Sequence, residues 1–266
     1  MQSIQRSAQI DGWTVNIESP SAAIESVTAA ARRLEGFTCF TLNLDHLVKL
    51  RRLQEFRLAY YAARFVTADG TPIVRMARRQ WPELKKTTGS DLLVPLCKAA
   101  AEHDLPVYLF GSSNDVLRET TRRLQVATRN RLHISGFEAP PQNFDVNASW
   151  ADESIDRITT SGARLCFVML GAPKQELFAT RAVKRGAKIG FICVGAAADF
   201  IAGREIRAPH FLQTIGLEWL WRLAHNPRRL AMRYARCARL LILLELNYRT
   251  SRKAAKRFRK NFARDR

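Results

Sequence analysis

The sequence predicts an α/β protein with a Rossmann-like, largely parallel sheet of about six strands and a basic helical C-terminal appendage. Three observations lead to this prediction. Apolar, β-branched and aromatic runs alternate with helix-like patterns as far as Gly195, which is the order typical of parallel α/β sheets. Beyond Gly195 the alternation stops and one helical pattern follows another. Most of the excess of Lys and Arg gathers in this last part of the chain.

The predicted strands are short apolar runs, and the predicted helices lie between them as crossovers. The strands cover residues 37–42, 64–68, 106–111, 131–137, 163–171 and 188–195. The crossover helices cover residues 44–63, 91–103, 114–128, 151–162 and 173–186. With 266 residues, of which 47% are hydrophobic, the chain can bury the core that such a sheet needs.

The appendage is predicted to begin between residues 196 and 208, so we divide the chain into a core of residues 1–200 and an appendage of residues 201–266. Pro209 and Pro227 stand where helices of the appendage would begin, because proline is favoured in a first helical turn. From residue 222 to residue 266 there are 15 Lys or Arg and two acids, a net charge of +13 out of the total of +19. This charge predicts an anionic partner for the appendage, either a membrane surface or a nucleic acid.

The aromatic and apolar residues of the appendage bear on that choice. Trp219, Trp221 and Tyr234 lie among arginines, a mixture that suits the headgroup region of a membrane, although a solvated basic helix pair packed on the core is the simpler interpretation. The stretch ARLLILLELNY is apolar over only about nine residues, too short to span a bilayer but suited to lying in its interface.

The N-terminal and cysteine patterns indicate a cytoplasmic setting. The first residues lack the apolar stretch of about 7 to 15 residues that a signal peptide needs. The five cysteines include no CxxC pair and mostly stand among apolar residues, which favours reduced thiols over disulfides or a zinc site. We therefore expect a protein on the cytoplasmic side, soluble or peripheral.

Polar residues and glycines follow the predicted strands where they end. In an open α/β sheet, ligands bind outside the carboxyl ends of the strands, so these residues are expected to converge on one site. They are Thr41 and Asn43 after the first strand, Asp69 after the second, Gly111 with Ser112 and Ser113 after the third, Gly171 to Gln175 after the fifth, and Gly195 after the sixth.

Several of these residues have a structural interpretation beside the functional one. Asp69 suits a helix N-cap or an Asx-turn, but a carboxylate at this edge can also take a proton from a hydroxyl. Asn43 suits an N-cap, and His46 is more often a packing residue than a catalyst. The turn after Gly111 favours capping over phosphate binding, because no GxGxxG and no Walker lysine is present. Lys174 and Gln175 place a cation and an amide at a helix start, which exceeds what capping requires.

Taken together, TLNLDH, TADGTPIV, TGSDLL, LGAPKQE, VGAAADFIAG, RAP and GLEWLWRL with NPRRL resemble the WecG/TagA/CpsF family of bacterial glycosyltransferases. The resemblance runs from about Phe37 to Tyr234, with the motifs in the family's order and approximate spacing. It implies a Rossmann-like core with a C-terminal appendage that helps to complete the site at the membrane. It also implies transfer of a sugar from a nucleotide donor, usually UDP-linked, to a polyprenyl-diphosphate-linked saccharide on the cytoplasmic membrane face, with inversion at the anomeric carbon.

The resemblance also implies roles for individual residues. Asp69 matches the proposed general base, and the acceptor hydroxyl would give it a proton. The expected substrate-binding residues are Thr41, Asn43, Lys86, Gly111, Gly171, Lys174, Gln175, Gly195, Arg207, Arg222 and Arg229. Lys86 stands where the family often has arginine, and a lysine cannot bind a phosphate bidentately. Met232 also replaces a common arginine, for which the neighbouring Arg233 is the candidate substitute.

No cofactor is expected beyond the UDP-sugar donor itself. We expect a metal-independent reaction, because the sequence has no DxD that might hold a divalent metal, and arginines of the appendage would stabilise the leaving UDP. The NLDHLVKL and RFVTADG segments are more similar to the exopolysaccharide glucosyltransferases of the family, as in xanthan synthesis, than to its teichoic acid branch. UDP-glucose is therefore the expected donor, with UDP-N-acetylmannosamine or its uronic acid as the alternative and a basic nucleic-acid-binding protein as a remote one.

Overall fold

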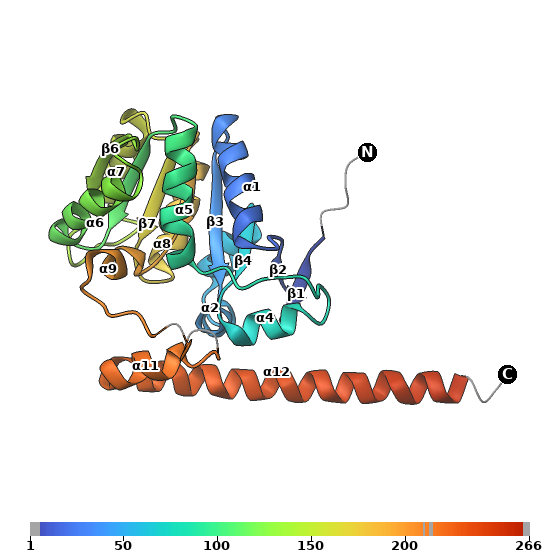
Figure 1. Cartoon of the computed structure of the whole chain (residues 1–266). Coiled ribbons are helices and arrows are strands. Elements are labelled where there is room, and N and C mark those ends of the chain that lie inside the picture. Colours follow the sequence, from blue (N-terminus) through green and yellow to red (C-terminus); the bar gives the residue numbers. More distant parts are fainter. Residues whose placement is uncertain (1–5, 210, 213–214, 263–266) are drawn as a thin grey trace.

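The centre of the computed structural model is a six-stranded sheet in which every paired strand is parallel (Figure 1). The structure describes residues 6–262 except residues 210 and 213–214. The spatial order is β4-β3-β8-β7-β5-β6. The predicted α/β class with a Rossmann-like sheet is confirmed. The strands are β3 (Phe37–Leu42), β4 (Phe65–Ala68), β5 (Val107–Gly111), β6 (Ile134–Glu138), β7 (Leu165–Met169) and β8 (Gly190–Cys193).

Helices cover both faces of the sheet, and each face has its own hydrophobic core. Successive strand residues point to opposite faces, so Leu109 enters one core and Phe110 the other. This is why the strands are apolar without interruption. One layer holds α1 (Pro20–Arg32), α5 (Gly89–Glu102), α6 (Asn114–Ala127) and α9 (Ala197–Ala202); the other holds α2 (Leu44–Leu50), α3 (Gln54–Tyr61), α7 (Ser149–Thr160) and α8 (Lys174–Lys184).

The structure contains elements that the sequence pattern did not predict. A short hairpin of β1 (Ala8–Ile10) and β2 (Trp13–Val15) precedes α1, and α4 (Thr71–Ala77) follows β4. The prediction of one helix over residues 44–63 was wrong, because the chain leaves helical geometry at Leu53 (φ −104°, ψ 110°) between α2 and α3. Strands of three residues are too short to show an alternating pattern.

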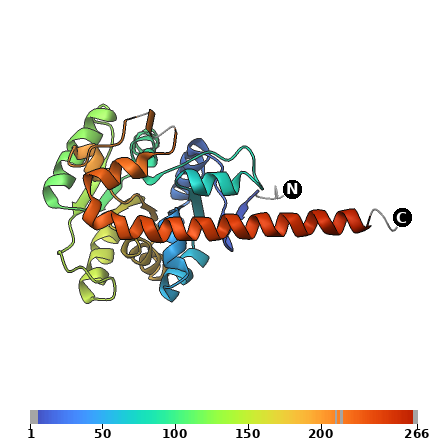
Figure 2. The ribbon, with the colours of Figure 1, turned by 90° about the horizontal axis from the view of Figure 1, so that it is seen from below.

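The appendage lies across one end of the core (Figures 1 and 2). It contains α11 (Glu218–His225) and α12 (Pro227–Phe262), and Pro227 begins α12 as expected. The helix α12 packs on α2, and Leu240 is buried in the core cluster. Farther along, Glu245 accepts hydrogen bonds from Arg79 at 2.7 Å and from Arg75 at 2.9 Å. The helix then extends past the core, as Figure 2 shows.

The face of α12 that points away from the core is both apolar and basic. Ile242 and Leu246 are 61% and 54% exposed, and Leu243 is also exposed. Arg236 and Arg239 are exposed one to two turns earlier. Within the described residues, no helix combines the length and the apolar content needed to cross a membrane. The division between core and appendage near residue 200 stays a prediction.

Candidate active site

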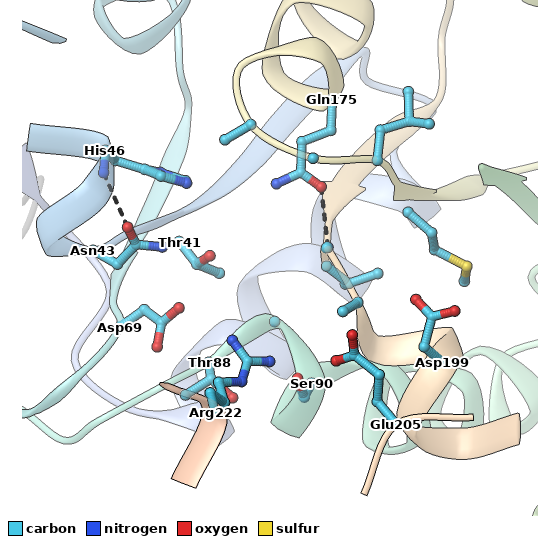
Figure 3. Close-up of a pocket in the computed structure, with 18 of the residues that line it drawn as sticks. Thr41, Asn43, His46, Asp69, Thr88, Ser90, Gln175, Asp199, Glu205 and Arg222 are labelled. Atoms are coloured by element: carbon cyan, nitrogen blue, oxygen red, sulfur yellow. Dashed lines mark hydrogen bonds between the residues drawn. The ribbon is translucent and has the colours of Figure 1, made fainter. Parts of the chain in front are cut away.

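A cavity of about 450 Å³ lies at the carboxyl ends of β4, β3, β8 and β7, which are neighbours in the sheet (Figure 3). The helix α11 and the first turns of α12 supply its remaining side. The expected convergence of strand ends is therefore observed at this edge. Of the predicted site residues, the cavity is lined by Thr41, Asn43, Asp69, Gly171, Gln175, Gly195 and Arg222.

Asp69 follows β4 directly, and its backbone N–H donates to the carbonyl of Leu42 on β3 at 2.8 Å. The chain then turns at Gly70, whose φ of 84° favours glycine, and Gly70 rather than Asp69 is the N-cap of α4. The helix has no side-chain cap, so the capping interpretation of Asp69 was wrong. Its carboxyl group faces the cavity instead (Figure 3).

The surroundings of Asp69 raise its pKa to about 7. Burial is the main cause, and the negative charge of Glu218 adds to it. Arg222 and a hydrogen bond from Asn43 act in the opposite direction. A carboxyl group with a pKa near neutrality can accept a proton during a reaction and release it afterwards.

Asn43 both caps α2 and orients Asp69. Its Oδ1 accepts the backbone N–H of His46 at 3.0 Å, as the N-cap interpretation predicted. Because the oxygen of the amide is used by the helix, its NH₂ group is the one that can donate to Asp69. Capping and site formation are thus performed by the same side chain.

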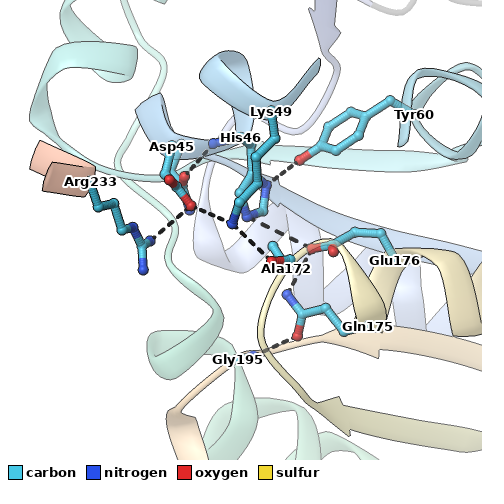
Figure 4. Close-up of polar contacts among 10 residues, drawn as sticks. Asp45, His46, Lys49, Tyr60, Ala172, Gln175, Glu176, Gly195 and Arg233 are labelled. Atoms are coloured by element: carbon cyan, nitrogen blue, oxygen red, sulfur yellow. Dashed lines mark hydrogen bonds and ion pairs between the residues drawn. The ribbon is translucent and has the colours of Figure 1, made fainter. Parts of the chain in front are cut away.

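A charged cluster joins α2 to the appendage (Figure 4). Asp45 contacts Lys49 at 2.6 Å and Arg233 of α12 at 3.2 Å. Lys49 also donates to the carbonyl of Ala172, in the loop before α8, at 2.8 Å. Lys49 and Arg233 line the cavity. Lys49 was not predicted; its only signal in the sequence is the i, i+4 spacing from Asp45.

Asp199 and Glu205 also line the first cavity, on the side opposite Asp69 in Figure 3. These two carboxylates were not predicted from the sequence. Asp199 accepts a hydrogen bond from Ser112 Oγ at 3.2 Å, and burial raises its pKa. The start of α5 lies next to them and contributes Gly89 and Ser90. Gly89 packs so closely on the chain just after β8 that an added Cβ would lie 2.7 Å from Val194 Cα.

A second cavity, of about 340 Å³, opens between the appendage and the helices α2 and α4. Asp69 lies where the two cavities meet, because both are lined by Asn43, Asp69, Thr88, Glu218, Arg222 and Arg233. The second cavity is lined by more apolar side chains, and Lys86 lies here rather than in the first cavity. Its apolar lining comprises Leu44, Pro72, Trp219, Cys237, Ala238 and Leu241.

Three other predicted site residues, Gly111, Lys174 and Arg207, are not among the residues that line either cavity. Gly111 is required by packing, since a Cβ there would lie 2.4 Å from the carbonyl oxygen of Met169. Lys174 turns away and donates to the carbonyl of Phe144 at 2.8 Å. Arg207 pairs with Asp91 of α5. The side chain of Arg229 lies outside the described residues.

Gln175 lines the first cavity, but both ends of its amide are used inside the protein. Its Oε1 accepts the N–H of Gly195 at 3.0 Å, and its Nε2 donates to Glu176 at 2.7 Å (Figure 4). Among the described residues, no group of three or more His, Cys, Asp or Glu is arranged to hold a metal ion. The metal independence of the reaction stays a prediction.

In a comparison with known protein families, the chain matches a family of glycosyl transferases. The family described as "Glycosyl transferase WecG/TagA/CpsF family" matches residues 8–255, nearly the whole chain. The match covers the sheet, the cavity and the docked part of α12.

Proposed function

The chain belongs to the WecG/TagA/CpsF family of glycosyl transferases, and on that premise we propose that it transfers a sugar from a UDP-sugar to a polyprenyl-diphosphate-linked saccharide. The observation that carries this proposal is the position of Asp69 between two cavities of different character. The polar cavity at the sheet suits a nucleotide sugar. The more apolar cavity beneath the appendage suits the acceptor.

The chemistry that follows is a single displacement with inversion at the anomeric carbon. The acceptor oxygen forms a bond to this carbon while the bond between the carbon and the UDP oxygen breaks. The acceptor hydroxyl loses its proton to Asp69, whose pKa of about 7 suits a general base. The leaving UDP gains negative charge, which Arg222 and Arg233 would stabilise from the appendage side and Lys49 from α2.

The charges in the first cavity support a neutral donor sugar. Asp199 and Glu205 line it together with Asp69 and Glu218, whereas its cations, Lys49, Arg222 and Arg233, are the ones proposed to stabilise the UDP. A sugar that carries its own carboxylate would meet like charges there, whereas sugar hydroxyls can donate hydrogen bonds to carboxylates. We therefore prefer UDP-glucose in exopolysaccharide synthesis, with UDP-N-acetylmannosamine as the alternative and its uronic acid as a less suitable donor.

We place the protein at the cytoplasmic face of the inner membrane as a peripheral protein. The exposed apolar residues of α12, Ile242, Leu243 and Leu246, lie between arginines, and this combination suits an anionic lipid interface. A nucleic acid would satisfy the arginines but would leave these aliphatic side chains in water. The lipid interface is therefore the better supported partner.

The test measures UDP release from UDP-glucose, UDP-N-acetylglucosamine, UDP-N-acetylmannosamine and its uronic acid, with polyprenyl-diphosphate saccharides in vesicles. Asp69→Asn keeps the shape of the side chain but removes the base, so turnover should fall about 100-fold or more while UDP binding is retained. Added EDTA should leave the wild-type rate unchanged. Equal turnover of Asp69→Asn and wild type would refute the role of Asp69, and acceptor-independent release from every donor would refute the transfer reaction.

A further inference from the structure

Behind the first cavity lies a buried polar residue that the proposed chemistry does not use. Glu176 of α8 is fully buried, with 0% of its surface exposed. Its Oε1 accepts a hydrogen bond from Gln175 Nε2 at 2.7 Å, and its Oε2 has no hydrogen-bond partner among the described residues. Burying a carboxyl group in this way is unfavourable, and a leucine of similar size would avoid the penalty. The position therefore calls for an explanation other than packing.

Toward the sheet, Glu176 determines which way the amide of Gln175 points. The Nε2 of Gln175 donates to Glu176, so its Oε1 must face the other way. That oxygen accepts the N–H of Gly195 at 3.0 Å. Gly195 begins the turn after β8 that lines the first cavity, and its φ is 56°. Glu176 thereby fixes this turn through the side chain of Gln175.

Toward α2, Glu176 faces the ring of His46, which is also buried (Figure 4). The Nε2 of His46 lies 3.8 Å from Glu176 Oε1, and its Nδ1 lies 2.6 Å from the hydroxyl of Tyr60. Burial lowers the pKa of His46 to about 3, so the ring is neutral and uses one nitrogen as donor and the other as acceptor. The ring is thus held between two elements, α3 and α8.

His46 connects this contact to the proposed base. Its backbone N–H donates to Asn43 Oδ1 at 3.0 Å, and the amide of Asn43 hydrogen-bonds Asp69. A series of contacts therefore runs from the turn after β8, through α8 and α2, to the end of β4. Its links are hydrogen bonds except for the 3.8 Å approach of Glu176 to the His46 ring, and the link from His46 to Asn43 is made by the backbone N–H. Buried networks of this kind favour one arrangement of the elements that they join.

We propose that Glu176 is a positioning residue, which holds the turn at Gly195 and the Asn43–Asp69 pair in the relative placement that transfer requires. The inference rests on the proposed function for its effect on catalysis. Glu176 acts without touching substrate. It is connected to the Gly195 turn through Gln175 and to the Asn43–Asp69 pair through His46. Replacing the carboxyl group should therefore disturb both sides of the cavity together.

Three variants separate this role from a merely structural one. Glu176→Gln keeps an oxygen that can accept from Gln175, whereas Glu176→Leu fills the same space without one. Phe178→Leu is the matched control, because Phe178 is on the same helix, is also fully buried, and stacks on Phe110, which is not part of the series. It should lower the stability of the fold, so it shows what a loss of core packing alone does to turnover and to amide exchange.

The experiment measures turnover with the best donor and, in the same variants, the exchange of the Gly195 and His46 amide protons by NMR. We expect Glu176→Leu to lower kcat at least tenfold and to speed the exchange of both amides at least tenfold, while Glu176→Gln stays within threefold of wild type. Phe178→Leu should leave kcat within twofold.

The inference is overturned if Glu176→Leu exchanges these amides no faster than Phe178→Leu, or if Glu176→Gln is as impaired as Glu176→Leu. A wild-type protein that transfers no sugar would overturn the proposed function instead. In that case the exchange rates still decide whether Glu176 couples the two sides of the cavity.

Discussion

Glu218 and Arg222, one turn apart on α11, should move the pH dependence of the reaction in opposite directions. Both line the cavity with Asp69. The negative charge of Glu218 raises the pKa of Asp69, and the positive charge of Arg222 lowers it. Glu218→Gln should therefore shift the acid limb of kcat/KM to lower pH, and Arg222→Gln should shift it to higher pH.

The size of the effect follows from the pKa of about 7. Since Asp69 must be ionised to accept a proton, the rate should fall about tenfold for each pH unit well below that value. Removing one neighbouring charge is expected to move the pKa by on the order of half a unit to one unit. At pH 6, Glu218→Gln should then be roughly three to five times faster than wild type, relative to the plateau of each protein.

The assay is UDP release at limiting donor between pH 5 and pH 9, since kcat/KM reports the ionisation of the free enzyme. Arg222→Gln should also lower the plateau, because it removes a cation from the leaving group, but the midpoint of its limb can still be read. Limbs that coincide in the three proteins, or a wild-type midpoint near 4, would contradict the assignment of the base.

Two further predictions concern the appendage. Leu243→Glu with Leu246→Glu should release the protein from anionic vesicles in a sedimentation assay, whereas Leu53→Glu, at an exposed site between α2 and α3, should not; retained binding of the double variant would refute the proposed lipid face. Glu245→Gln breaks the pairing with Arg75 and Arg79 and should lower the free energy of unfolding in urea by about 1 kcal/mol. An unchanged value would mean that this contact does not hold α12 on the core.

The edge of the sheet that carries the cavity was predictable from the sequence because of a simple rule of parallel sheets. Asp69 and Asn43 follow apolar runs, and β3 and β4 are neighbours, so both residues reach the same cavity. Gly111 ends an equally clear strand, but this strand, β5, lies beyond β7 in the sheet. The order of strands depends on tertiary packing, which the pattern along the chain does not contain.

Neighbouring residues of one motif can point in different directions, and helix geometry is the reason. Successive residues of a helix point about 100° apart, so Gln175 reaches the cavity while Lys174 turns to Phe144. The sequence predicted that the appendage is positively charged, but it did not predict which of its residues contact the core. Arg233 enters the site only because α12 packs on α2 beside Asp45.

The single acid of α12 has a consequence for how the molecule moves in an electric field. Between residues 219 and 264 the only acidic residue is Glu245, and its charge is neutralised by Arg75 and Arg79 of the core. The rest of the long helix is therefore positive, and the molecule has a large permanent dipole whose positive pole lies on the appendage. Near a negatively charged surface such a molecule rotates before contact and arrives with this side first. Added salt should accordingly slow its arrival more than its departure, because aliphatic contacts made after arrival are not screened.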